Sequence, residues 1–367
     1  MTISTTMNKV LAGATLLTMG CMSQAEEPLF HDSHFHLTNY VQEGTDINDF
    51  LDIMGDKIGR STLFGIPLQQ TWSHENSGDF APTYYLHSDA PLYYYSFTDA
   101  YIANEYLSLD EQDRDRFDPM ITGFNPADMY AADHIRRVLE TYPGVFSGIG
   151  EFTIHKEFVS SKVAGDIASL TDPALDRILD FAGEVGLVVI LHSDIDVPFA
   201  GDTKGLVYLK QMVDLLMRHP ETTVIWAHTG LGRVVAPISA QASPETAERS
   251  FNQFDIVDGI IQEPGLSHVY FDISWSEVAK YAVRDAEAIE ETIEFLNTHA
   301  DRILFGTDNV APTEQAKHLE VYHMWDPIWA GLDVAASQKI RMGNYERLFD
   351  AARDRVRSWE AQNITGR

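Results

Sequence analysis

The chain shows short apolar runs that alternate with amphipathic stretches from Leu29 onward, which is the pattern of repeated strand–helix units. Eight of the apolar runs have the length and content of buried strands. They cover residues 29–36, 61–68, 119–124, 145–152, 187–192, 223–228, 268–273 and 302–306. Eight parallel strands, each followed by a helix, close a (β/α)₈ barrel. The pattern therefore predicts an α/β fold of the TIM-barrel type.

The stretches between the predicted strands carry the helical period. The clearest span residues 127–141, 173–185, 206–219 and 286–299, and further helical segments occupy residues 314–359 after the eighth strand. Pro143-Gly144, Gly186 and Pro220 stand where three of these helices should end, because proline and glycine interrupt helical backbone. No linker or internal repeat divides the pattern. We therefore predict a single barrel domain over residues 26–367.

One segment departs from this alternation. Residues 69–90, between the second strand and the next helix, are polar and aromatic and include Trp72, His74 and His87. On a barrel this loop would lie at the catalytic mouth, because it follows the carboxyl end of a strand. It could be a lid or a substrate wall, and a plain surface insertion fits the pattern equally well.

Polar side chains stand at the ends of the predicted strands. Asp32, His34 and His36 alternate near the end of the first strand, so their side chains should share one face. Other strands end at Glu151 (the fourth), His192 (the fifth), His228 (the sixth) and Asp308 (the eighth). Each residue alone fits a structural role. Together they indicate one site, because the carboxyl ends of all barrel strands open at the same mouth.

The cysteine content restricts the chemistry of this site. Cys21 is the only cysteine, so the site has no thiolate and the chain forms no internal disulfide. A metal held by imidazoles and carboxylates is typically Zn²⁺, with Mn²⁺, Fe²⁺ and Ni²⁺ as alternatives. Three or four protein ligands leave one position for a water molecule, which the metal activates as a nucleophile.

The charge of the chain argues against nucleic acid as a partner. The 55 acidic residues outnumber the 26 basic ones and give a formal net charge of −29. Such a surface repels phosphate backbones and anionic lipid. We therefore expect a small-molecule substrate and an acidic, solvated surface. The sequence leaves open whether the chain forms a homo-oligomer.

The first 25 residues resemble an export signal. Lys9 precedes an apolar run over residues 10–20, which is too short for a stable membrane anchor. Ser23-Gln24-Ala25 is a small-x-small cleavage site that would release a soluble chain beginning at Glu26. Alternatively, Gly20-Cys21 resembles a bacterial lipobox, and a lipid on Cys21 would anchor the protein. We therefore expect an exported, periplasmic protein with no transmembrane segment in its mature chain.

Several of these residues, taken as motifs, resemble the amidohydrolase superfamily. The motifs are the His-x-His of the first strand, the histidines that end the fifth and sixth strands, and Phe305-Gly-Thr-Asp308. The closest branch is the amidohydrolase-related (family 2) proteins. Gly343-Asn344-Tyr-Glu-Arg-Leu-Phe349 is similar to their C-terminal element, and Thr122-Gly-Phe-Asn-Pro126 is similar to their third strand. The resemblance spans residues 30–350.

The resemblance implies roles for the histidines at the strand ends. His34 and His36 would bind a divalent metal together with Asp308, and His192 would complete the ligands. His228 would bind a second metal, or would contact the substrate as an acid/base or electrostatic group. These roles place metal chemistry at the carboxyl ends of the strands.

The two carboxylates have separate implied roles. Glu151 matches the position of a bridging carboxylate and is similar to the arrangement in TatD-type nucleases, which favours two metals over one. Many one-metal members of the family-2 branch lack that carboxylate. Asp308 would be both a ligand and the general base that takes a proton from the attacking water.

Three further residues are candidates for substrate binding. Lys156, shortly after Glu151, could anchor a substrate carboxylate. Arg233 could clamp an anionic group or cap a helix. Trp275 stands at the end of the seventh strand, where substrate walls form. Asp194 could line the pocket or cap the helix that follows the fifth strand, and the cap is favoured.

The leading hypothesis for function is hydrolysis of an amide, lactone or other ester bond in a small molecule. The alternative is a lyase of the same branch, a metal-dependent decarboxylase or hydratase. A non-catalytic extracytoplasmic binding protein is disfavoured because the ligand set is complete. A nuclease is disfavoured by the negative charge and by the lack of a basic groove.

Overall fold

The computed structural model describes residues 1, 27–39, 44–66, 71–72, 86–87, 97–156, 168–195, 207–232, 238–239 and 250–364. Eight strands within these residues form one parallel sheet in which each strand lies beside the next one along the chain. The strands are β1 (Phe30–Asp32), β3 (Ile58–Leu63), β6 (Phe117–Ile121), β7 (Gly148–His155), β8 (Val188–Ser193), β9 (Val224–Trp226), β12 (Val269–Asp272) and β13 (Ile303–Leu304).

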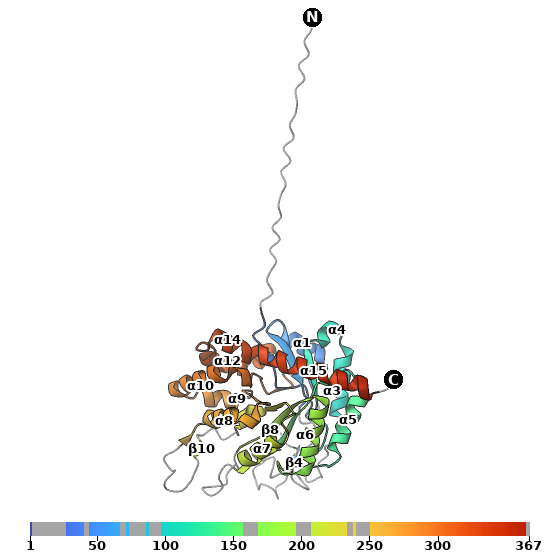
Figure 1. Ribbon diagram of the computed structural model, residues 1–367. Helices are drawn as coiled ribbons and strands as arrows, with labels where there is room; N and C mark the ends of the chain where they lie inside the picture. The colour runs from blue at the N-terminus through green and yellow to red at the C-terminus, as the bar shows by residue number, and fades with distance from the viewer. Residues whose placement is uncertain are drawn as a thin grey trace.

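The sheet closes into a ring between its first and last strands. Beyond β1 and β13 the chain continues as β2 (Phe35–His36) and β14 (Asn309–Val310), which pair in parallel. The Asp308 N–H donates to the His34 carbonyl at 2.8 Å beside this pair. Helices lie around the outside of the sheet (Figure 1). The predicted TIM barrel is therefore confirmed.

The helices follow the strands as the amphipathic pattern predicts. They are α1 (Ile47–Met54), α3 (Thr98–Ser108), α4 (Glu111–Arg114), α5 (Ala131–Thr141), α6 (Pro173–Val185), α7 (Val207–Arg218), α8 (Gln253–Gln262), α9 (Ser276–Ala282), α10 (Ala286–His299), α11 (Gln315–His318), α12 (Glu320–Met324), α13 (Asp326–Trp329), α14 (Val334–Gln338) and α15 (Asn344–Asn363). The predicted bounds of α6 are correct because local signals set both ends. The Asp172 carboxylate accepts the Ala174 N–H, Pro173 begins the helix, and Gly186 ends it in the left-handed conformation.

Most elements differ from the predicted bounds by a few residues, as three of them show. β3 begins at Ile58, earlier than predicted, and includes Gly59 and Arg60. α5 begins at Ala131, later than predicted, because the Asn125 side chain accepts the Ala127 N–H and holds a turn there. β9 ends at Trp226, before the predicted His228. The turn that follows β9 is part of the functional site.

Helix α15 closes one end of the barrel. Its residues Tyr345, Leu348, Phe349 and Ala352 form one apolar cluster with inward-facing strand residues such as Val188. Burial of these side chains from water holds the helix across the barrel end. Figure 1 shows α15 running over the strands at that end.

The C-terminal Gly-Asn-x-x-Arg-Leu-Phe element has a structural role in this packing. The Asn344 amide donates to the carbonyls of Ala300 at 2.6 Å and Ile303 at 2.7 Å. It therefore satisfies backbone groups where the last helices join β13. The element fixes the start of α15 and is not part of a catalytic site.

A buried carboxylate strengthens the contact between α15 and the strands. Asp118, the second residue of β6, is fully buried. It accepts hydrogen bonds from Tyr345 and Arg60 at 2.8 Å and from Arg353 at 2.9 Å. Because Asp118 stands at the start of its strand, α15 covers the amino-terminal ends of the strands, away from the mouth where the strands end.

Some predictions concern residues outside the described part of the chain. The export segment falls there apart from Met1, and so does Arg233. Of residues 69–90, only β4 (Thr71–Trp72) and β5 (Leu86–His87) are described, and they pair in parallel. Among the described residues, no helix is both long enough and apolar enough to cross a membrane.

Candidate metal centre

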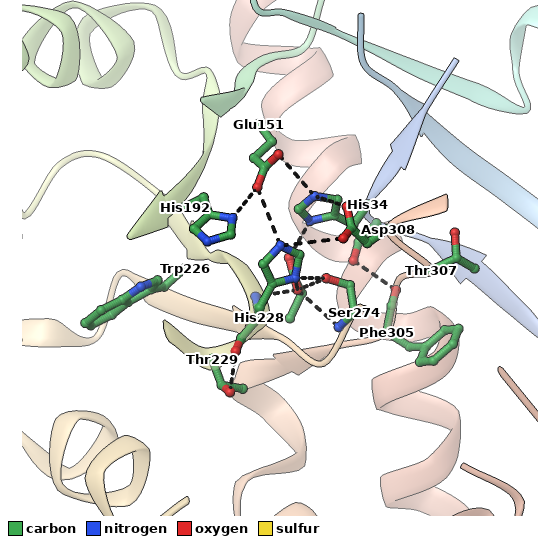
Figure 2. Close-up of polar contacts among 12 residues, drawn as sticks. His34, Glu151, His192, Trp226, His228, Thr229, Ser274, Phe305, Thr307 and Asp308 are labelled. Carbon is green, nitrogen blue, oxygen red and sulfur yellow. Dashed lines mark hydrogen bonds and ion pairs between the residues drawn. The ribbon is translucent and has the colours of Figure 1, made fainter. Parts of the chain in front are cut away.

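Glu151, on β7, lies between two pairs of imidazoles. Its Oε2 atom is 3.4 Å from His36 Nε2 and 3.7 Å from His34 Nε2. Its Oε1 atom is 2.6 Å from His192 Nδ1 and 3.5 Å from His228 Nε2. Figure 2 shows the carboxylate facing His34, His192 and His228. One carboxylate is therefore shared by four histidines from three different parts of the barrel.

The Asp308 carboxylate reaches the same centre from the place where the first and last strands of the ring meet. Its Oδ1 atom is 3.2 Å from His36 Nε2 and 3.4 Å from His34 Nε2, and its Oδ2 atom is 4.0 Å from His228 Nε2. The residue has a φ of 56°, in the left-handed region that few side chains adopt. This backbone turn directs the carboxylate inward, toward the histidines.

The six residues form overlapping sets that have the spacing of metal ligands. We call His34, His36 and Glu151 site A, and Glu151, His192 and His228 site B. In each set, one ligand atom from each residue lies within 4.8 Å of the others, and Asp308 forms a third such set with His34 and His228. The structure thus brings together all six residues that the sequence singled out.

Two nitrogen atoms at this centre indicate that it is built for a cation. His34 Nε2 and His228 Nε2 are buried and have no hydrogen-bond partner. A buried polar atom without a partner is costly, so such atoms mark a place for a ligand. Both nitrogens face the Glu151 and Asp308 carboxylates. Imidazole nitrogens and carboxylate oxygens without thiolate fit Zn²⁺, Mn²⁺, Fe²⁺ or Ni²⁺.

The turn after β9 places His228 in the centre. His228 and Thr229 have φ values of 54° and 55°, so the chain leaves the strand direction directly after Ala227. The His228 N–H donates to the Asp272 carboxylate at 2.9 Å, which holds the turn in place. The sequence pattern predicted the residue but not this turn.

The first strand also departs from the predicted alternation. The chain bends at Ser33 and His34, so the Asp32 side chain does not share the face of the two histidines. The Asp32 carboxylate instead accepts the N–H groups of Thr307 at 2.8 Å and His34 at 3.1 Å. It lies 3.3 Å from the buried His318 Nε2. Asp32 therefore joins the first and last strands of the ring.

Charges around the centre keep both carboxylates ionised. Burial would raise the pKa of Glu151, but the Lys156 ammonium and the neighbouring histidines, His192 first among them, hold that pKa well below its usual value. Burial would likewise raise the pKa of Asp308, and the neighbouring His228 and His36 hold it well below its usual value. Both groups are therefore anionic near pH 7 and can act as ligands.

The histidines differ in how readily they hold a proton. Burial lowers the pKa of His228, and although the Asp308 carboxylate opposes this effect, the imidazole remains neutral near pH 7. Burial would also lower the pKa of His34, but Asp272 and Glu151 raise it well above its usual value. A metal that binds His34 must therefore displace a proton.

Sequence reasoning missed Asp272, and it placed Ser274 in a substrate wall without its contact to a histidine. Asp272, the last residue of β12, is fully buried, and its Oδ2 atom is 3.0 Å from His34 Nδ1. The Ser274 hydroxyl lies 2.8 Å from His228 Nδ1. Of the two roles considered for Asp194, the structure has it beside the pocket and not at a helix cap, because its carboxylate contacts His192 Nε2 at 3.0 Å. Asp272 offered a signal, since it also is a polar residue near a strand end.

Two of the three predicted substrate-binding residues lie beside the centre. Lys156 follows directly after β7 and is buried, with 9% of its surface exposed. Its Nζ atom is 5.8 Å from the centroid of the Trp275 ring, within the range of a cation–π contact. The Trp275 ring in turn lies 5.2 Å from the His228 ring. These residues form part of the wall next to site B.

A barrel with imidazoles and carboxylates gathered at the carboxyl ends of its strands has the architecture of a metal-dependent enzyme. The chain belongs to the amidohydrolase family, because the sequence profile of that family matches residues 32–351. It is therefore an enzyme of the amidohydrolase superfamily, whose members are metal-dependent. No curated protein sequence matches the chain.

The chain is also similar to solved structures. A 2,6-dihydroxybenzoate decarboxylase from Rhizobium is 16% identical, with 89% of this chain and 99% of that chain covered and a TM-score of 0.48. A dihydroorotase from Campylobacter jejuni is 11% identical, with 88% and 83% covered and a TM-score of 0.47. Similarity at this level does not define the reaction of the present enzyme.

Proposed function

We propose that the protein is a metal-dependent hydrolase that cleaves an amide, lactone or other ester bond in a small molecule. The observation that carries the proposal is the position of Glu151 between the imidazoles of site A and those of site B. A carboxylate shared in this way fits a bridge between two metal ions. Paired metals a few ångströms apart are typical of hydrolytic enzymes.

The ligands in this proposal are those that the geometry groups together. His34, His36 and Asp308 would hold one ion, His192 and His228 would hold the other, and Glu151 would contact both. A divalent metal, for which we favour Zn²⁺, would supply Lewis-acid activation of a water molecule and of the substrate carbonyl. If only one ion is held, His228 would instead contact the substrate and stabilise the negative charge that develops on the carbonyl oxygen.

Asp308 is the group best placed to move the proton. Its carboxylate is ionised and within 3.2–4.0 Å of the His34, His36 and His228 nitrogens, so it faces the place where a nucleophilic water would lie. We propose that Asp308 accepts the proton of that water and delivers it to the leaving group. Lys156 and Trp275 would form the substrate wall, with Lys156 as the anchor for a substrate carboxylate.

The metal content of the Glu151→Ala variant tests this proposal. We expect two equivalents of divalent metal in the native protein and one in the variant, which should also be a weaker enzyme, because the shared ligand is lost. Inductively coupled plasma mass spectrometry of the purified proteins measures this. Glu294→Ala, which removes an exposed carboxylate of α10, is the matched control and should keep two.

A different result would point to the alternative reaction. One equivalent of metal in both the native protein and Glu151→Ala would contradict the two-metal centre. The metal-dependent decarboxylase or hydratase would then be favoured, and release of CO₂ or loss of water from candidate substrates would be measured instead of bond hydrolysis.

We also propose that the protein is exported to the periplasm. The basis is the sequence of residues 1–25, with Lys9, the apolar run after it and two processing signals. Mass spectrometry of the processed amino terminus should find either Glu26 or an acylated Cys21 as the first residue. A chain that keeps Met1 and stays inside the cell would contradict export.

A further inference from the structure

A single buried carboxylate lies behind one imidazole of each proposed metal site. Asp272 Oδ2 is 3.0 Å from Nδ1 of His34, which belongs to site A. Asp272 Oδ1 accepts the backbone N–H of His228, which belongs to site B, at 2.9 Å. The same oxygen accepts the Ser274 N–H at 3.2 Å and the Ser274 hydroxyl. Asp272 thus contacts both sites from behind.

These contacts fix which nitrogen of each ring faces the centre. An ionised carboxylate can only accept, so His34 must donate from Nδ1, and its Nε2 is left to bind a metal, which displaces the proton there. The Ser274 hydroxyl donates to Asp272 and therefore accepts from His228 Nδ1, which is 2.8 Å away (Figure 2). The His228 Nε2 is then free as well. These two Nε2 atoms are the buried nitrogens that have no hydrogen-bond partner.

A second carboxylate of this kind, Asp194, acts on one site alone. Asp194 Oδ1 is 3.0 Å from His192 Nε2, on the side of the ring away from Glu151. Among the described histidines of the two sites, His192 of site B alone contacts the Asp194 carboxylate. Asp272 therefore contacts residues of both sites, whereas Asp194 contacts a residue of site B.

We propose that Asp272 is a positioning residue that orients His34 directly and His228 through Ser274. The metal affinities of both sites therefore depend on this one carboxylate. This inference rests on the proposed metal centre. Carboxylates behind metal-binding imidazoles fix the tautomer and the ring orientation, and their loss typically costs about 10- to 100-fold in metal affinity. Replacing Asp272 should therefore weaken both sites together, whereas replacing Asp194 should weaken only site B.

The test is a Zn²⁺ titration of the metal-free full-length protein against a chromophoric chelator. For Asp272→Asn we expect both dissociation constants to rise by about 10- to 100-fold. For Asp194→Asn we expect a rise in only one. Asp118→Asn is the control, because Asp118 is a buried carboxylate at the other end of the barrel. It should lower the melting temperature and leave Zn²⁺ affinity unchanged.

A Co²⁺ spectrum and a second variant separate positioning from folding. With both sites loaded, Asp272→Asn should shift the visible absorption bands of Co²⁺, and Asp118→Asn should not. If Asp272→Asn does not fold, Ser274→Ala removes only the partner of His228 Nδ1 and should weaken one site. Native Zn²⁺ affinities together with an unshifted Co²⁺ spectrum in Asp272→Asn would overturn this inference. If Ser274→Ala has to replace Asp272→Asn, native Zn²⁺ affinity in Ser274→Ala would overturn it. Neither result would contradict the proposed metal centre. A native protein that binds no Zn²⁺ would overturn the proposed metal centre itself.

Discussion

Replacing His34 and His36 together by alanine is expected to abolish both metal binding and activity. The change removes two of the three members of site A and also the His34 nitrogen that faces Asp308. Glu151 and Asp308 would then be buried anions that lack the two imidazoles of site A. The remaining groups could not coordinate a cation. Metal analysis after purification measures the loss, and activity on an amide or ester substrate should fall to background.

The control for this double variant removes two imidazoles outside the centre. His268, in the turn before β12, contacts the Leu216 carbonyl of α7, and His299 of α10 pairs with Asp258 of α8. The His268→Ala, His299→Ala protein should keep its metal even if it is less stable. Full metal occupancy in the His34→Ala, His36→Ala protein would show that the metal is bound elsewhere and would contradict the proposed metal centre.

Replacing Asp308 by asparagine is expected to separate metal binding from catalysis. Asparagine keeps the size of the side chain and one oxygen that can act as a ligand, but it cannot accept the proton of the attacking water. Metal should therefore largely stay, while kcat falls by roughly 10²- to 10⁴-fold, the usual contribution of general base catalysis. KM should change little, because in this proposal Asp308 transfers the proton and does not hold the substrate in place.

The measurement is steady-state kinetics on the amide or ester that a substrate screen identifies, with metal content determined on the same samples. Asp56→Asn, at an exposed position that pairs only with Lys57 among the described ion pairs, is the matched control and should have native kinetics. Near-native kcat in Asp308→Asn would leave the proposed mechanism without its proton acceptor. A different base would then have to be sought.

The sequence by itself determined the elements and the candidate ligands that the fold brings together. Helix α10 has its predicted bounds because Asp285 caps its first turn, a signal that lies within a few residues of the helix end. Each predicted strand corresponds to a strand of the barrel, since continuous apolar runs of this length are buried strands. The position of Glu151 or Asp308 at a strand end then implied a common mouth, because parallel strands of a barrel all end on one side.

The tertiary structure alone decided how these residues are held. His34 and Asp272 are 238 positions apart in the chain, and no local pattern connects them. The turn that carries His228 depends on the same distant carboxylate, so the predicted end of that strand was wrong. Asp194 contacts His192 and not a helix end for a similar reason, as buried groups take the partners that the fold brings near. Local propensity sets the elements, whereas the choice of hydrogen-bond partners requires the closed ring.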